Sequence, residues 1–439
     1  MELLDRALIF LQDYFLYVRD QFTQRTLLTW FLFFFPIVVF FELPRYALPL
    51  VLMPILRLLG VPRDDSEEQE AFLRTEPLVS IIVAARNEEE VIGDTIASLL
   101  SIEYPNKEII VVDDASTDRT YEIARPYAEN GLIKLLSNTA PSGRGGRPIA
   151  SNYGFRMSTG EFIISVDADT TFDRDLIQRM IGPFYDSSVG AVAGNVKVRN
   201  IGQSSWTDLQ AAEYAVGISL WKRWTNILGS TLQASGACGA FRREALHDAG
   251  AWSAEITEDI DVSMKVHKLG WKVRFAPDAI ALTTVPATFR GLVRQRVNWE
   301  RGFLRLYYHK HGDALRFWRF DFATAYEMGM EYLMTVVFNL LYAVYIALMV
   351  AFAFRLLTFV LIGCYVFYTA LTFVTLLLAI SMSERRRHEW WLLQYAFVYP
   401  LYKGILRWVR FYALVTETLR INYRDPYLPE TAYDNTERW

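Results

Sequence analysis

The sequence predicts an α/β domain with a mostly parallel sheet, set between apolar helical segments of the 439-residue chain. Hydrophobic residues make up 52% of the chain, more than an ordinary soluble enzyme carries. They are concentrated in residues 27–60 and 330–380, whereas residues 62–320 have the composition of a soluble domain. Within that block, short apolar runs alternate with amphipathic helical stretches, which is typical of a parallel sheet covered on both faces.

We expect residues 1–60 to form an N-terminal region of interfacial and transmembrane helix. Residues 1–25 mix aromatic and charged residues at helical spacing, as interfacial helices do. Residues 27–60 are almost purely apolar but contain several prolines, so they hold one long kinked span or two tight ones. The acidic start of the chain argues against a secretory signal peptide. The charged residues 61–77 are expected to form a linker.

The α/β domain itself is expected in residues 78–287. Six short apolar runs predict strands at residues 78–85, 108–114, 133–137, 162–169, 189–196 and 273–282, and the first of them is rich in β-branched residues. Ser235 to Leu246 form a Gly-rich stretch that predicts a tight turn before a helix. The two cysteines, Cys238 and Cys364, lie in different segments, so no disulfide is expected and a reduced, cytosol-facing domain is the simplest interpretation.

After this domain, residues 288–316 are expected to form amphipathic interfacial helices. Their arginine residues would face the anionic lipids of the inner leaflet, although a solvated charged face is the alternative. The net charge of −4 favours no particular partner, and nucleic acid is not expected as one.

Residues 317–416 are expected to hold C-terminal transmembrane and interfacial helices, followed by a polar tail at residues 417–439. Two apolar runs, near residues 332–354 and 356–380, are each long enough to span a bilayer. A pair of spans returns the basic residues 385–387 to the side of the α/β domain, as the positive-inside rule prefers. We therefore expect a multi-pass protein of the inner or plasma membrane with a cytoplasmic catalytic domain.

Carboxylates follow two of the predicted strands. Asp113 and Asp114 end one strand, and Asp167 and Asp169 end another. A single acidic residue in such a place is usually a turn former or a helix cap. Two clusters at the carboxyl edge of one sheet instead indicate a ligand site, since ligands of open α/β sheets bind there. Asp167 and Asp169 flank one small residue and suit Mg²⁺ or Mn²⁺.

Five motifs in order resemble a known family: ARNEEE from Ala85, VVDDASTD from Val111, DAD from Asp167, TEDID from Thr257 and QRVNW from Gln295. Together they resemble the inverting family 2 glycosyltransferases of the GT-A fold. Within that family the chain looks most like bacterial synthases of poly-N-acetylglucosamine, hyaluronan, chitin oligomers or cellulose. The resemblance covers about residues 77–310.

The resemblance implies a site for a UDP-sugar donor and a divalent cation. Asn87, Glu88, Asp113 and Asp114 would hold the uridine part of the donor. Arg147 would lie near the diphosphate, Asp167 would contact the nucleotide, and the metal ligands would be Asp167 and Asp169.

It also implies a base and an acceptor site. Asp259 would deprotonate the acceptor hydroxyl, and Trp299 would stack against the acceptor sugar. Glu258, Gly236 and Gln295 would complete that site. A single carboxylate base implies one direct displacement with inversion. The alternative for Thr257 to Asp259 is a helix cap without a catalytic role.

One position departs from the family pattern. Asn298 stands in QRVNW where the family motif has arginine. Arg296 or Arg301 could supply the missing cation, and Arg301 is the expected substitute in donor binding.

These features predict a membrane-embedded transferase that adds a hexose or N-acetylhexosamine to a growing polysaccharide, processively and with translocation through its own helices. Polar residues that could line such a pore are Tyr326, Glu327, Glu331 and Asn339. The alternative is transfer of one sugar to a lipid acceptor, such as a polyprenyl phosphate, ceramide or diacylglycerol. A third alternative, from another class, is a non-catalytic membrane scaffold with a degenerate transferase fold.

Overall fold

The computed structural model describes residues 48–59, 67–138, 146–316, 321–352 and 354–419, with a few single residues before residue 21. The helices expected within residues 1–47 and most of the tail expected at 417–439 lie outside these ranges. The first described helix is α3 (Leu48–Leu58).

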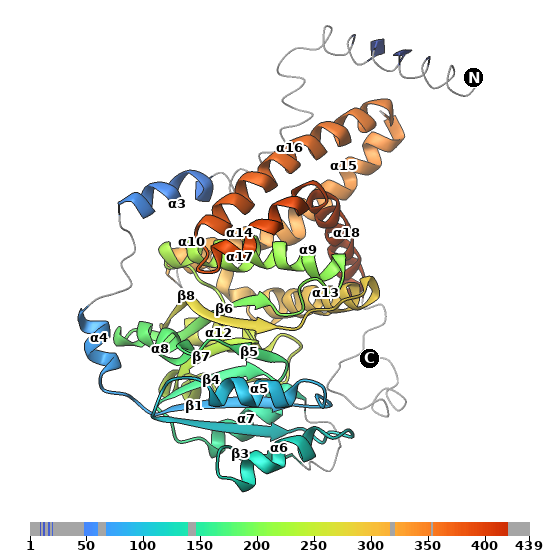
Figure 1. Ribbon diagram of the computed structural model, residues 1–439. Coiled ribbons are helices and arrows are strands. Elements are labelled where there is room, and N and C mark those ends of the chain that lie inside the picture. Colours follow the sequence, from blue (N-terminus) through green and yellow to red (C-terminus); the bar gives the residue numbers. More distant parts are fainter. Residues whose placement is uncertain are drawn as a thin grey trace.

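A mixed, eight-stranded sheet forms the centre of the protein (Figure 1). Its order is β3-β2-β1-β4-β7-β6-β8-β5. The neighbours β3, β2, β1 and β4 are all parallel, and so are β6 and β8. The strands are β1 (Val79–Ala85), β2 (Lys107–Asp113), β3 (Lys134–Ser137), β4 (Phe162–Asp167), β5 (Thr170–Phe172), β6 (Val189–Val198), β7 (Cys238–Arg242) and β8 (Lys272–Thr283).

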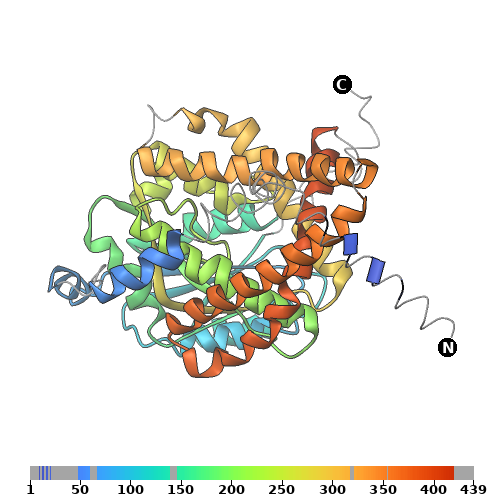
Figure 2. The same ribbon diagram turned by 90° about the horizontal axis from the view of Figure 1, so that it is seen from above.

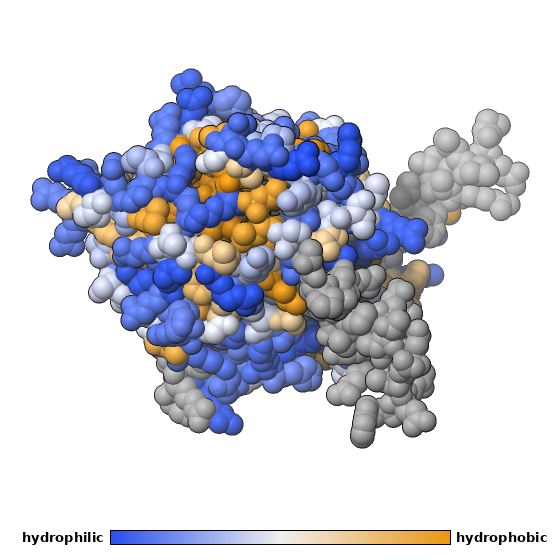
Figure 3. Space-filling view, turned by 90° about the horizontal axis from the view of Figure 1, so that it is seen from below, coloured by the Kyte–Doolittle hydropathy of each residue, from blue (hydrophilic) through white to orange (hydrophobic). Residues whose placement is uncertain are grey.

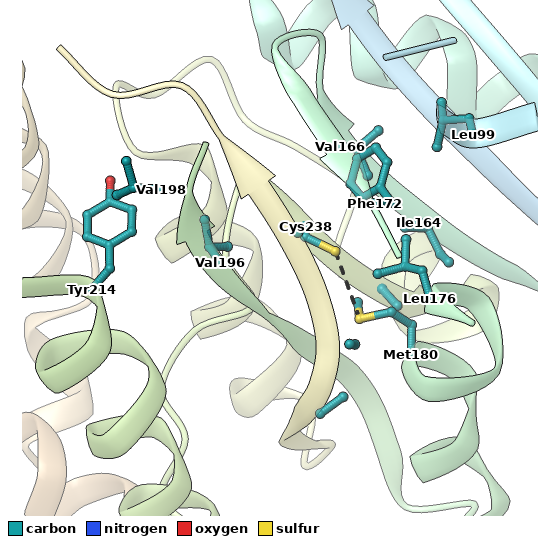
Figure 4. Close-up of a cluster of buried hydrophobic side chains, with 14 of the residues drawn as sticks. Leu99, Ile164, Val166, Phe172, Leu176, Met180, Val196, Val198, Tyr214 and Cys238 are labelled. Atoms are coloured by element: carbon teal, nitrogen blue, oxygen red, sulfur yellow. Dashed lines mark hydrogen bonds between the residues drawn. The ribbon is translucent and has the colours of Figure 1, made fainter. Parts of the chain in front are cut away.

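Two of these strands, β5 and β7, were not among the six expected ones. β7 lies within the stretch from Ser235 that predicted only a turn before a helix, and it pairs antiparallel with both β4 and β6. Close contacts explain its small residues, since a Cβ on Gly239 would lie 2.9 Å from the carbonyl oxygen of Ser235. The Cys238 thiol points to Met180 in the core, with 3.9 Å between the sulfur atoms (Figure 4).

Helices cover both faces of the sheet, so the strands are apolar on both sides. Successive residues of β1 show this, because Ile81 and Val83 belong to one buried cluster and Ile82 to another. The helices of this domain are α5 (Ile92–Leu100), α6 (Thr120–Glu129), α7 (Arg147–Met157), α8 (Leu176–Ile181), α11 (Arg243–Asp248) and α12 (Glu258–Lys268).

Part of the expected linker is folded. Helix α4 (Glu67–Leu73) lies within residues 61–77 and packs its Phe72 ring edge-on against Phe162, with 5.7 Å between the ring centroids. A single aromatic residue among many charges was too weak a signal to indicate this docking from the sequence.

The remaining helices lie on one side of the sheet (Figures 1 and 2). Two are interrupted by a π-helical turn and a third ends in one, a feature that often marks functional sites. These helical segments are α9 (Ser205–Tyr214), η3 (Ala215–Leu220) and α10 (Trp221–Ile227); α13 (Phe289–Leu304) and η4 (Arg305–Lys310); and α14 (Phe322–Tyr332), η6 (Leu333–Val337) and α15 (Phe338–Phe352). They are followed by α16 (Phe354–Ser381), α17 (Arg386–Glu389), η7 (Trp390–Phe397) and α18 (Tyr399–Thr418).

Two helical stretches among the described residues are long and apolar enough to cross a membrane, Phe322–Phe352 and Phe354–Ser381. Helices α15 and α16 form a hairpin that extends away from the sheet (Figure 1). This hairpin exposes apolar residues such as Val344, Leu348 and Val366. On the side turned away from this hairpin, hydrophilic residues predominate around the rim, and hydrophobic residues gather toward the middle of the face (Figure 3).

The loop after α16 returns to the sheet and is fastened there by ion pairs. Arg223 of α10 donates to Glu384 over 2.7 Å, and Arg385 binds Asp173. Lys197 of β6 binds Glu389 and also donates to Ser383 over 2.7 Å. The loop that carries the basic residues 385–387 therefore packs against the α/β domain.

Candidate active site

A cavity of about 300 Å³ opens at the carboxyl ends of the adjacent strands β1, β2 and β4. Because these strands are parallel, their ends share one edge of the sheet, where ligands of open α/β sheets bind. The cavity is lined by Ala84, Ala85, Arg86, Glu88, Asp114, Gly146, Arg147, Asp167, Ala168 and Asp169. Glu88, Asp114, Arg147, Asp167 and Asp169, all expected in the donor site, are thus brought together.

Asp167 and Asp169 are the carboxylates suited to hold a divalent cation. Oδ1 of Asp169 accepts hydrogen bonds from the hydroxyl groups of Thr170 and Thr283, both 3.1 Å away. Burial raises the pKa of Asp169, and the charge of Asp167 raises it further. No group of three or more metal-binding side chains was found in the described part of the chain, so a cation would need further oxygen ligands. Mg²⁺ and Mn²⁺ commonly obtain these from phosphates and water.

Glu88 shows the same crowding of negative charge. Its pKa is raised to about 7, first by burial and then by Asp169, Asp167 and Asp118. Clustered carboxylates repel one another, and a bound cation would relieve that repulsion. The donor set of the cavity therefore fits a divalent cation.

Asn87 has a role that the sequence did not suggest. Its backbone lies in the left-handed region, at φ 54°, and its side-chain carbonyl accepts the N–H of Thr117 at 2.8 Å. Its own N–H donates to Ser116 Oγ at 3.0 Å. Asn87 therefore joins the loop after β1 to the loop after β2, and it is absent from the residues that line the cavity.

Asp114 and Asp113 are both buried, but their partners differ. Asp114 accepts hydrogen bonds of 2.7 Å from the Asn138 side chain and from the N–H of Gly146, so it holds the residues that precede α7. Asp113 Oδ2 accepts a long 3.4 Å bond from Ser116. Its Oδ1 is buried and has no hydrogen-bond partner among the described residues. An acceptor of this kind suits a donor group of a bound nucleotide base.

Arg147, the first residue of α7, connects the cavity to the expected base. Its Nε lies 2.8 Å from Asp167, and its other nitrogens bind Glu258 and the carbonyl oxygen of Gly236. Burial lowers the pKa of Arg147, but the charges of Asp167 and Glu258 raise it by more, so the guanidinium group stays protonated.

Glu258 and Asp259 occupy the first turn of α12. Asp259 Oδ2 accepts the N–H of Gly236 at 3.1 Å, and its Oδ1 accepts the N–H of Ile260 at 2.9 Å. Burial raises the pKa of Asp259, although Arg147 and these backbone donors lower it in part. The Thr257 side chain makes no capping bond to the helix. The side-chain cap that was the alternative for these residues is therefore not formed by Thr257.

Helix α13 carries two of the residues expected at the acceptor, Gln295 and Trp299. Trp299 is 40% exposed, and the Arg296 guanidinium lies 4.3 Å from its ring centroid. Gln295 has a buried side-chain oxygen with no partner among the described residues. These features leave an aromatic face and an amide oxygen for a sugar, but neither residue lines the 300 Å³ cavity.

The geometry does not favour Arg301 as the substitute for the missing arginine of the motif. Arg301 donates to Thr416 of α18 at 2.8 Å, and Arg296 pairs with Glu213 at 2.8 Å. Neither lines the cavity. A third basic residue, Arg305, pairs with Glu417 at 2.6 Å. These side chains thus face internal partners distant in the sequence, and not the lipid surface expected for them.

A second cavity, of about 390 Å³, lies where α14 meets α10. Apolar and aromatic side chains dominate its lining, among them Trp221, Trp224 and Met330. Tyr326, Glu327 and Glu331, expected to line a pore, are in this lining, whereas Asn339 is not. The indole N–H of Trp221 donates to Glu327 at 3.2 Å.

Lys222 of α10 was not expected near the base. Its ammonium group binds Ser235, next to Gly236, and contributes to the electrostatic environment of Asp259. No sequence spacing connects Lys222 to the base, because the α10–β7 connection folds back on itself to bring them together.

Residues 80–250 match the family model of glycosyl transferase family 2. The poly-beta-1,6-N-acetyl-D-glucosamine synthase of Staphylococcus epidermidis is 37% identical over 226 residues, which cover 51% of this chain and 54% of the relative. The enzyme of the same name from Staphylococcus aureus is 35% identical over 229 residues, with the same coverage. The chain spans about half the length of these curated relatives.

Among solved structures, a mannosyltransferase from Pyrobaculum calidifontis, in complex with GDP-Man and Mn²⁺, has a TM-score of 0.57 and 20% identity. The similarity covers 87% of this chain and 97% of that one. At this identity the likeness shows the fold, and it confirms the GT-A architecture expected from the sequence.

Proposed function

We propose that this chain, whose residues 80–250 match glycosyl transferase family 2, is a membrane-embedded inverting glycosyltransferase. It transfers a hexose or N-acetylhexosamine from a UDP-sugar to the end of a growing polysaccharide. The poly-N-acetylglucosamine synthases that share 35–37% identity support a polysaccharide product. They also make UDP-N-acetylglucosamine the first donor to test.

One observation carries this proposal: Arg147 joins Asp167, in the cavity, to Glu258, beside Asp259. A donor held at Asp167 and Asp169 would therefore lie next to a base. Asp259 accepts two backbone N–H groups, which orient its carboxylate. A base that takes the proton of an acceptor hydroxyl promotes direct attack on the sugar carbon, and a single displacement inverts that carbon.

Departure of the nucleoside diphosphate requires that its negative charge be neutralised. Asp167 and Asp169 would hold Mg²⁺ or Mn²⁺, which when bound would stabilise the charge on the diphosphate. Arg147 adds a fixed positive charge at the same edge. Asp113 would accept a hydrogen bond from the nucleotide base through its buried Oδ1, and Glu88 and Asp114 would shape the cavity around the donor.

The test is turnover of the detergent-purified protein against UDP-N-acetylglucosamine, other UDP-sugars and GDP-mannose, with Mn²⁺ or Mg²⁺. The release of nucleoside diphosphate is followed, and the product is sized. Polymer of high molecular weight from one UDP-sugar without added acceptor supports the proposal. Release from no donor, with the protein folded and the metal present, would refute it.

A second candidate is transfer of one sugar to a lipid acceptor. It is favoured by the mostly apolar 390 Å³ cavity at the start of α14, in which Glu327 and Glu331 are the acidic groups. This function predicts that nucleotide release depends on added lipid extract and that labelled sugar partitions into the organic phase. Label retained in water-soluble polymer would exclude it.

A further inference from the structure

Lys222 of α10 contacts the turn that holds the base. Its ammonium group donates hydrogen bonds to Ser235 Oγ and, over 3.4 Å, to the carbonyl oxygen of Gln233. The following residue, Gly236, donates its N–H to Asp259 Oδ2 at 3.1 Å. Residues 233–236, which we name the base turn, therefore lie between Lys222 and Asp259.

The base turn is also tied to α12 at a second point. The N–H of Ala234 donates to Ser263 Oγ at 3.0 Å, and the Ser263 hydroxyl donates to the carbonyl oxygen of Asp259 at 2.6 Å. Movement of this turn would therefore move the backbone N–H group that Gly236 donates to the Asp259 carboxylate. Lys222 restrains the turn from the α10 side.

The charges around Asp259 come from several elements. Arg147 of α7 and Lys222 of α10 both lower its pKa, against burial, which raises it. Glu258 of α12 and Tyr307 of η4 are the other titratable groups that interact with it. Burial lowers the pKa of Lys222 to about 8, although Asp259 and the nearby Cys238 raise it.

We propose that Lys222 is a positioning residue for the base. Its ammonium group fixes the base turn so that Gly236 and Asp259 keep their hydrogen bond, and its positive charge favours the carboxylate form of Asp259. This inference rests on the proposed function in that it takes Asp259 as the base.

Variants of Lys222 and Ser235 separate the two effects. Lys222→Met removes both the charge and the hydrogen bonds. It should lower kcat and move the acid midpoint of the kcat/KM profile up by about one pH unit, since a nearby positive charge is lost. KM for the sugar nucleotide should not change. Lys222→Arg should keep the wild-type midpoint, and Ser235→Ala should lower kcat with the midpoint unchanged.

Arg223→Met provides the matched control, because it removes the neighbouring cation of the same helix, which pairs with Glu384 instead. Its acid midpoint should equal that of the wild type. An unchanged midpoint in Lys222→Met, or an equal shift in Arg223→Met, would overturn the proposal.

A second readout needs no turnover. Infrared spectroscopy can follow the protonation of Asp259 in protein without sugar nucleotide. The carboxyl band of Asp259 is the one that is missing from the spectrum of Asp259→Asn. It should titrate at higher pH in Lys222→Met than in the wild type, and at the wild-type pH in Lys222→Arg. Identical titration in Lys222→Met and the wild type would overturn the inference. A wild type without turnover would refute the proposed function alone, because the infrared titration still measures the effect of Lys222 on Asp259.

Discussion

The Nε atom of Arg147 lies 2.8 Å from Oδ1 of Asp167, and the same guanidinium group binds Glu258. One cation thus joins a carboxylate of the donor cavity to the helix of the proposed base. Glu258 is only 6% exposed, so it depends on this partner for compensation of its charge.

Arg147→Met should therefore destabilise the fold as well as stop turnover. Breaking a buried ion pair from one side costs about 3–5 kcal/mol of unfolding free energy, because the other charge is left without a partner. The double variant Arg147→Met/Glu258→Gln should recover most of that loss but no activity. Denaturant unfolding of the wild type, the two single variants and the double variant measures the coupling. Additive losses would show that the pair is not coupled.

Asp169→Asn should abolish nucleoside diphosphate release while leaving the fold intact. The amide keeps hydrogen-bonding capacity toward Thr170 and Thr283 but loses the charge that a cation needs. A chelator should stop the wild type, and added Mn²⁺ should restore it. Asp175→Asn, which alters an exposed ion pair on α8, is the control and should keep full activity. Undiminished turnover of Asp169→Asn would contradict the assignment of the metal site.

Glu88 gives the metal-free protein a pH dependence of stability. Burial and the nearby carboxylates raise its pKa to about 7 in the folded chain, above the usual 4.5 of a glutamate. The folded protein therefore binds the additional proton between these values, and its unfolding free energy falls as pH rises through that window. Glu88→Gln should flatten this part of the profile. The effect is reduced by solvent because Glu88 is only partly buried. Melting temperatures of the wild type and of Glu88→Gln at pH 5 and pH 8 would show the effect. An equal change with pH in the two proteins would refute it.

Asp259→Asn should lower kcat by about 10²–10⁴-fold, the usual contribution of a general base. KM for the sugar nucleotide should stay near the wild-type value, because Asp259 does not line the donor cavity. Steady-state kinetics at saturating metal separate the two constants. Glu255→Gln, which changes a surface partner of Lys310, is the control for a charge lost near the same helix. A variant that loses donor affinity but keeps kcat would assign Asp259 to binding.

Asp278 and Glu384 form a hydrogen-bonded carboxyl pair between β8 and the loop after α16. The pKa of Asp278 is raised to about 6 by burial and by Glu384, whereas that of Glu384 is lowered despite burial, chiefly by Arg223. The pair shares a proton below this pH, so ionisation of Asp278 should weaken the contact as pH rises through about 6. Asp278→Asn should remove this dependence. Limited proteolysis of the loop at pH 5 and pH 7.5 tests it, and equal cleavage of the wild type at both would contradict it.

The sequence predicted those parts of the fold in which local pattern and burial agree. All six expected strands are present. Most are apolar runs buried on both faces, as in β1 and β4, whereas β3 (KLLS) is a short, partly exposed edge strand. β7 was missed because Cys238, Gly239 and Ala240 are small and not β-branched. Their small size suits close packing between β4 and β6, and this tertiary requirement cannot be predicted from a local sequence pattern.

In the site, the carboxylates of Asp114, Asp167 and Asp169 could be predicted because they lie at the ends of β2 and β4. Arg147 was expected near the diphosphate, but its contact with Glu258 could not be foreseen. Lys222 and the internal partners of Arg296 and Arg301 depend on tertiary contacts between distant segments. A basic helix looks the same in sequence whether its partners are lipid phosphates or the carboxylates of Glu213 and Glu417.

The ion pairs that fasten the loop after α16 have a mechanical consequence. A helix of 28 residues is about 42 Å long, longer than the hydrocarbon core of a bilayer, about 30 Å. If α16 crosses a membrane, tilting is one way in which it can match that thickness. Because Lys197 and Arg223 hold its end against the sheet, the tilt is passed to the α/β domain. The thickness of the surrounding lipid would then set the angle at which the cavity faces the membrane surface.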